Sequence, residues 1–297
     1  MLRWLSSAAL LKEASLETRT ASFIGDEGIK LAADVIGTPL RGAVLFAHGG
    51  GQTRHAWAEA GARVAHLGWQ AILLDLRGHG ESAWAESGDY RLQRFAADLV
   101  LASEQLDRRP HLVGASLGGL AGLFAETYTR AEAFKSLTLV DITPNMEPAG
   151  VARVMGFMSE RLQHGFASVE EAADIIANYL PHRPRPKDLS GLAKNLRLSP
   201  DGRYRWHWDP RFVSSVMESR KQHSIEDMQA ALPGVRIPVH LIRGRMSELV
   251  TEENARAFVE SLPSAKFTDI ADAGHMVAGD RNDAFVDAVV SFIHALE

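Results

Sequence analysis

The chain has 297 residues, 46% of them hydrophobic, and a formal net charge of −5. This length suits one α/β domain of about 200–250 residues with an insertion. The mildly acidic balance argues against nucleic acid or an anionic membrane as a partner. Because the chain contains no cysteine, disulfides, a cysteine nucleophile and a cysteine-ligated metal are excluded. No run approaches the roughly 18 apolar residues of a membrane span, and we expect a cytoplasmic protein.

The first 20 residues are expected to form an N-terminal extension. Residues 1–11 are apolar enough to suggest a signal peptide, but Lys12 and Glu13 end the stretch before a convincing hydrophobic region and cleavage site. A short helix or a misassigned start fits this segment better than a secretion signal does.

Strand and helix signals alternate along the rest of the chain, which predicts a mostly parallel sheet with helices on both faces. Helical periodicity is clear over residues 91–106 and again near the C-terminus. The eight expected strands lie at residues 21–24, 30–35, 43–47, 71–74, 111–113, 137–140, 239–242 and 266–270.

A glycine loop follows the expected strand at 43–47, where residues 48–52 read HGGGQ. Glycines expose backbone N–H groups, which an oxyanion hole needs. Gly50 is our first choice as a donor, and Gly51 is the near alternative. His55 and Trp57 come next and could line a substrate pocket, although a packing role at a helix start fits them equally well.

A second motif, GASLG at residues 114–118, lies between an apolar strand and a helix-like run. A serine on such a sharp turn is exposed above the sheet, and small residues must flank it because the turn leaves no room for side chains. The motif predicts that Ser116 is a nucleophile and that the backbone N–H of Leu117 is the second oxyanion donor.

The alternating pattern breaks after Asp141, and we interpret residues 144–231 as an insertion. Phe157, Trp206 and Trp208 within it could form a wall of the substrate pocket, or they could pack as the insertion's own core. Beyond the insertion, His275 follows the last expected strand in the sequence AGHM and is the candidate general base.

The order of glycine loop, serine and late histidine resembles the α/β-hydrolase superfamily, and so does DLRGHGES at residues 75–82. The resemblance covers nearly the whole chain apart from the extension and the insertion. It implies a doubly wound, mostly parallel eight-stranded sheet, formed by residues 21–143 and 232–297. It also implies a mainly helical cap, residues 144–231, inserted after strand 6.

The acid of the resulting triad stays open between two residues. In most relatives the acid follows the seventh strand, three residues after a glycine, but Ser247 occupies that position here. A serine cannot stabilise an imidazolium as a carboxylate does. Asp141, at the end of the sixth strand, is favoured because a rigid strand end aims its side chain well. Glu248, one residue past the usual place, is the alternative.

The resemblance implies a serine hydrolase that cleaves a small-molecule carboxylic ester, thioester or lactone through an acyl-enzyme. A serine at the nucleophile position argues against haloalkane dehalogenases and epoxide hydrolases, which need a carboxylate there. One alternative is hydrolysis of a C–C bond in a β-diketone-like substrate with the same triad, and another is a non-catalytic ligand-binding homologue. No metal or organic cofactor, nucleic acid or membrane is implied, and monomer and homodimer are both open.

Overall fold

A computed structural model describes residues 16–181, 183, 185–219, 225–262 and 264–297. The helix expected near the N-terminus falls in residues 1–15, outside the described part. The central sheet has eight strands in the order β1-β2-β4-β3-β5-β6-β9-β10. Their bounds are β1 (Thr18–Ile24), β2 (Lys30–Ile36), β3 (Ala43–Ala47), β4 (Gln70–Leu74), β5 (His111–Ala115), β6 (Ser136–Val140), β9 (Val239–Gly244) and β10 (Ala265–Ile270).

The sheet is mostly parallel, as predicted. Only the pairs β1–β2 and β2–β4 are antiparallel, and all the other strand pairs are parallel. The central strands are buried and mostly apolar, as expected where helices cover both faces of a sheet. In the β5–β6 register Ala115 lies opposite Val140, so the residues that follow, Ser116 and Asp141, leave the sheet side by side at the same edge.

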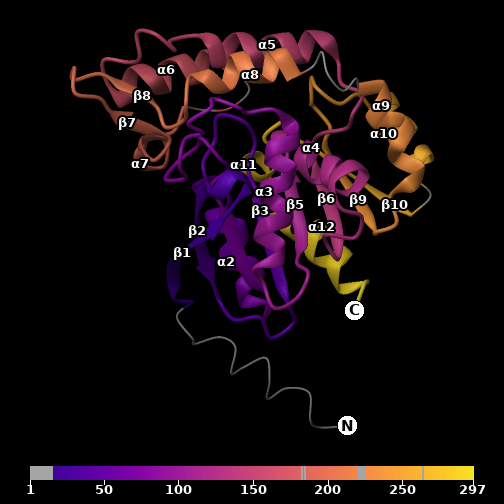
Figure 1. Cartoon of the computed structure of the whole chain (residues 1–297). Helices are drawn as coiled ribbons and strands as arrows, with labels where there is room; N and C mark the ends of the chain where they lie inside the picture. Colours follow the sequence, from indigo (N-terminus) through magenta and orange to yellow (C-terminus); the bar gives the residue numbers. More distant parts are fainter. Residues whose placement is uncertain (1–15, 182, 184, 220–224, 263) are drawn as a thin grey trace.

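Two helical layers enclose the sheet (Figure 1). On one face α2 (Ala58–His66) and α12 (Asn282–His294) pack on a core that includes the fully buried Phe285. On the other, α3 (Leu92–Glu104), α4 (Leu117–Phe124) and α10 (Glu252–Ser261) contribute to a core that includes Phe95. Burying each such aromatic side chain contributes about 1.5–3 kcal/mol to stability. The short elements are η1 (Asp26–Gly28), η2 (Arg54–Trp57), η3 (Ala125–Thr129), η4 (Leu232–Gly234) and α11 (Val277–Asp280).

The segment between β6 and β9 is mainly helical and lies across one end of the sheet (Figure 1). It contains α5 (Pro148–Ser159), α6 (Val169–Tyr179), α7 (Ser190–Ala193), β7 (Leu196–Leu198), β8 (Tyr204–Trp206), α8 (Arg211–Ser219) and α9 (Ile225–Ala231). A bridge between Trp208 and His79 connects this cap to the core. The predicted cap after the sixth strand is therefore confirmed. In the described part of the chain, no helix combines the length and apolar character needed to cross a membrane.

Candidate active site

Ser116 lies on a strained turn between β5 and α4. Its φ of 46° and ψ of −111° are unusual for a residue other than glycine. The two flanking glycines are required by space. A Cβ on Gly114 would lie 2.5 Å from backbone atoms of the next turn, and one on Gly118 would lie 2.4 Å from the carbonyl oxygen of Ala47. The sequence GASLG thus folds into the sharp turn that the motif predicts.

The loop after β10 brings His275 to Asp141, which directly follows β6. Their side chains are 2.8 Å apart, between Nδ1 of the imidazole and Oδ2 of the carboxylate. Asp141 is fully buried and has a φ of 50°, a left-handed conformation that aspartate tolerates better than most residues. The backbone N–H of Gly244 donates to its Oδ1 at 3.0 Å. These hydrogen bonds offset the cost of burying a carboxylate.

The other two residues considered for the acid have different surroundings. Ser247, in the turn after β9, donates a hydrogen bond to Oδ2 of Asp141 at 2.5 Å. The side chain of Glu248 is 60% exposed and forms an ion pair with Arg153 of α5. The structure therefore brings Asp141 and Ser247 together with His275, and it directs Glu248 towards the cap.

The glycine loop after β3 is held by hydrogen bonds that leave one glycine N–H available. Gly49 donates to Oε1 of Gln52 at 3.0 Å, and Gly51 donates to Nε2 of His79 at 3.1 Å. Burial lowers the pKa of His79 to about 3, so its imidazole is a neutral acceptor. Within the described part of the chain, the backbone N–H groups of Gly50 and Leu117 have no hydrogen-bond acceptor.

His48 also supports the glycine loop, through hydrogen bonds that involve both of its ring nitrogens. Its Nδ1–H donates to the carbonyl oxygen of Gly49 at 2.8 Å, and its Nε2 accepts from the backbone N–H of Leu76 at 3.1 Å. Burial lowers the pKa of His48, and the nearby Asp75 only partly opposes this effect. With both ring nitrogens engaged, His48 supports the loop and does not face the cavity.

A cavity of about 530 Å³ lies between the sheet edge and the cap, and both Ser116 and His275 line it. The five residues expected to contact substrate also line it: His55, Trp57, Phe157, Trp206 and Trp208. Trp57 and Trp208 are each only 2% exposed, so most of their surface packs against other side chains. The pKa of His55 is lowered by burial and by the adjacent Arg54.

Two further residues that line the cavity, Tyr179 and Lys194, are not among the five expected to contact substrate. Tyr179, at the end of α6, stacks on Phe157 with ring centroids 4.1 Å apart. Among the described residues that line the cavity, Lys194, just after α7, is the only lysine, arginine, aspartate or glutamate. Helical periodicity alone does not reveal which residues of a cap face the cavity, because this depends on how the cap lies over the core.

An ion pair ties the cap to the loop that carries His275. Arg183, in the segment after α6, binds Asp280 of α11 with Nε and Oδ1 3.0 Å apart, and it also donates to the carbonyl oxygen of Gly279 at 2.9 Å. The second oxygen of Asp280 accepts the backbone N–H of Gly274 at 2.9 Å. The residue before His275 is thereby linked to the cap through a single carboxylate.

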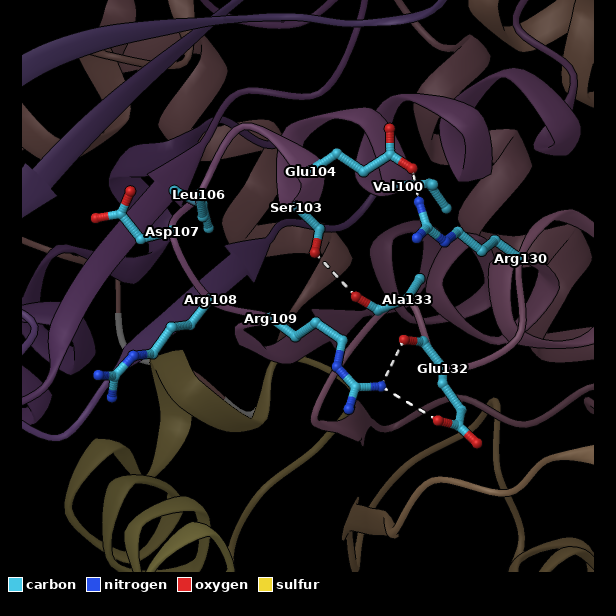
Figure 2. Close-up of a pocket in the computed structure, with 10 residues that line it drawn as sticks. All are labelled: Val100, Ser103, Glu104, Leu106, Asp107, Arg108, Arg109, Arg130, Glu132 and Ala133. Atoms are coloured by element: carbon cyan, nitrogen blue, oxygen red, sulfur yellow. Dashed lines mark hydrogen bonds and ion pairs between the residues drawn. The ribbon is translucent and has the colours of Figure 1, made fainter.

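A second hollow, of about 260 Å³, lies beside the end of α3 (Figure 2). Four of its charged side chains form two ion pairs, Arg109 with Glu132 and Arg130 with Glu104. The hydroxyl of Ser103 donates to the carbonyl oxygen of Ala133 at 2.9 Å. The serine of this hollow is bonded to a backbone carbonyl, and no histidine is among the described residues that line it. It therefore lacks the histidine and carboxylate pair found at the larger cavity.

Comparison with known proteins agrees with this architecture. Residues 42–281 match the family described as alpha/beta hydrolase fold. The chain belongs to this family and is an enzyme of the α/β-hydrolase fold.

Two relatives illustrate the similarity. Esterase Rv0045c from Mycobacterium tuberculosis is 28% identical over 83% of this chain and 80% of its own length. A solved structure of that esterase superposes with a TM-score of 0.75, at 25% identity and 99% coverage of both chains. An α/β hydrolase from Novosphingobium aromaticivorans superposes with a TM-score of 0.79 at 20% identity, covering 95% of this chain and 99% of its own.

Proposed function

We propose that the chain is a serine hydrolase that cleaves carboxylic esters, with thioesters and lactones as chemically equivalent substrates. The observation that carries this proposal is the contact of 2.8 Å between His275 Nδ1 and Asp141 Oδ2, beside a cavity that Ser116 also lines. A base oriented by a buried carboxylate and a strained serine are the parts that acyl transfer needs.

In the proposed mechanism, the Ser116 hydroxyl attacks the carbonyl carbon of the ester while His275 accepts its proton. The Asp141 carboxylate accepts a hydrogen bond from Nδ1–H of the imidazole, so Nε2 is the nitrogen that takes the proton from Ser116. The carboxylate fixes this tautomer and stabilises the imidazolium that forms. His275 then donates the proton to the departing alcohol, and water repeats the sequence to release the acid from the acyl-enzyme.

The negative charge on the tetrahedral intermediate requires donors that are already in place. We assign this role to the backbone N–H groups of Gly50 and Leu117, which have no acceptor within the described residues. Gly51 is the weaker candidate because its N–H is already bonded to His79. Each donor of this kind contributes about 10²–10³-fold to kcat in well-studied enzymes.

The cavity walls support an acyl substrate with an apolar part. Phe157, Tyr179 and Trp206 form an aromatic group on the cap side, with ring centroids 4.1 and 5.9 Å from Phe157. Such rings bury apolar groups effectively. The esterase relative from Mycobacterium tuberculosis supports ester cleavage in particular.

The test is hydrolysis of p-nitrophenyl esters from acetate to decanoate by the purified protein, with the S116A variant in parallel. We expect release of p-nitrophenol that the variant loses, and an optimum in chain length set by the cavity. If the wild-type protein and the variant release it at the same rate, the proposal is wrong. If the wild type releases none but reacts with a fluorophosphonate at Ser116, the activity lies elsewhere, such as in C–C cleavage.

A further inference from the structure

The turn that follows β9 contains a serine at the position where relatives usually carry the triad acid. We propose that Ser247 is a positioning residue, and that its hydroxyl holds the Asp141 carboxylate in the orientation that serves His275. This inference rests on the proposed function, and it adds a fourth residue to the catalytic arrangement. Three features of the structure support it.

The first is the direction of the hydroxyl hydrogen. A serine hydroxyl has one hydrogen to donate and two lone pairs to accept with. The Oγ of Ser247 accepts the backbone N–H groups of Leu249 at 3.1 Å and Val250 at 3.2 Å. Both lone pairs are therefore engaged, and the remaining hydrogen points to Oδ2 of Asp141, 2.5 Å away. The turn thus fixes the serine as a donor.

The second feature is that two donors share one carboxylate oxygen. Oδ2 of Asp141 accepts from Ser247 and also from Nδ1 of His275, and Oδ1 accepts from the N–H of Gly244. These three bonds prevent rotation of the carboxylate about its Cβ–Cγ bond. Without the Ser247 hydroxyl, Oδ1 keeps its bond from Gly244 and Oδ2 keeps its bond from His275. Oδ2 then has no second donor to hold it in place beside the imidazole.

The third feature is that the turn and the His275 loop are packed as one unit. A Cβ on Gly244 would lie 2.1 Å from the carbonyl oxygen of Gly274, so the two segments are too close for any side chain at this position. The N–H of Met246 donates to the carbonyl oxygen of Ala273 at 2.8 Å. Because of this packing, Ser247 and His275 keep a constant relation to Asp141, which lies between them.

The experiment compares S247A, S247C and S247T with the wild type in steady-state ester hydrolysis. A hydrogen bond to a charged group corresponds to about 10- to 100-fold in rate, and we expect S247A to lose kcat by this factor with KM nearly unchanged. S247C keeps the size but is a weak donor, so it should lose kcat in the same way, while S247T, which keeps the hydroxyl, should recover most of it.

The matched control is T251A. Thr251 caps α10 by accepting the N–H of Asn254 at 3.1 Å, so its removal also frees a backbone N–H but leaves Asp141 untouched. We expect T251A to lower thermal stability with kcat within about twofold of wild type. If S247A or S247C is folded and has wild-type kcat, the inference is overturned. If S247A does not fold, S247C decides.

A spectroscopic readout separates this inference from the proposed function. The Nδ1–H proton of His275, bonded to a carboxylate, should give a low-field proton NMR resonance that S247A shifts or broadens and T251A preserves. This measurement does not depend on turnover. An inactive wild type with a resonance that responds to Ser247 would refute the proposed function alone, and a resonance unchanged in S247A would refute the positioning role.

Discussion

Nε2 of His79 accepts the backbone N–H of Gly51 at 3.1 Å, and this bond fixes the direction of one N–H group in the glycine loop. Nδ1 of the same ring donates to the carbonyl oxygen of Arg77 at 2.9 Å, so the tautomer is fixed. By engaging the N–H of Gly51, the imidazole leaves the N–H of Gly50 as the glycine-loop donor that we propose for the oxyanion hole.

Replacing His79 by phenylalanine should lower the acylation rate about two- to twelvefold, the effect of losing one hydrogen bond in the range of about 0.5–1.5 kcal/mol. The ring of His79 packs against Phe212 with centroids 4.8 Å apart, so a phenyl ring suits its apolar surroundings and the fold should persist. Stopped-flow acylation with p-nitrophenyl acetate would measure the effect. An unchanged acylation rate would mean that the loop keeps its shape without this bond.

The two carboxylates considered as the triad acid should differ sharply on mutation. D141N should lose about 10³–10⁴-fold in kcat, because an amide imposes the wrong imidazole tautomer. E248Q should stay within a few-fold of wild type, since an exposed ion pair such as Glu248–Arg153 contributes about 0–1 kcal/mol. Both variants would be assayed on the same ester at saturating concentration. Equal, small losses would contradict the assignment of Asp141.

Acid should destabilise the protein through its buried histidines. Burial lowers the pKa of His79 to about 3 and that of His111 and His240 to about 4, against a usual value of 6.5. Between these values the unfolded chain binds protons that the folded chain excludes, so the free energy of unfolding falls as pH drops below about 6.5. At pH 5 each of these histidines lowers the free energy of unfolding by up to about 2 kcal/mol.

Urea unfolding at pH 7 and at pH 5 would measure this loss. The variant H240N removes one titrating group from the core, and its unfolding free energy should depend less on pH than that of the wild type. Parallel pH dependences for the wild type and H240N would show that His240 does not contribute.

The charge of Lys194 should influence which esters the cavity prefers. An ammonium group at the cavity wall favours a substrate that carries a carboxylate, by about 1 kcal/mol or five-fold for a contact in water. K194E should therefore raise KM for a monoester of a dicarboxylic acid and leave KM for the neutral ester of equal length unchanged. The control is K187E, because Lys187 is exposed in the same cap segment but does not line the cavity. Equal effects on both esters would exclude selection by charge.

Much of the fold could be predicted because local patterns and the global architecture agree. Each of the eight expected strands is present, and most differ by only one to three residues at their ends. Buried parallel strands tend to be continuous apolar runs; β3 is such a run, and the polar residue His48 follows it directly. The turn at Ser116 was predictable for a similar reason, since only small residues fit beside it.

Relationships between distant segments were not predictable from the sequence in this way. The sequence shows that Ser247 occupies the usual position of the acid. It does not show that Ser247 bonds to Asp141, because the two residues are 106 positions apart. Tyr179 was missed because its place in the cavity depends on the packing of α6 against α5. The choice between Asp141 and Glu248 stayed open because both are carboxylates near the right strand ends, and only their surroundings distinguish them.

The Arg183–Asp280 pair has a consequence for engineering. Cap segments of this fold are attractive parts to exchange between enzymes when a new specificity is wanted. Here a transplanted cap without an equivalent of Arg183 would leave the carboxylate of Asp280, which is only 7% exposed, without its counter-ion. That carboxylate also holds the N–H of Gly274. A chimaera designed only for a new pocket shape would therefore also disturb the loop that carries His275, unless Asp280 were redesigned with the donor cap.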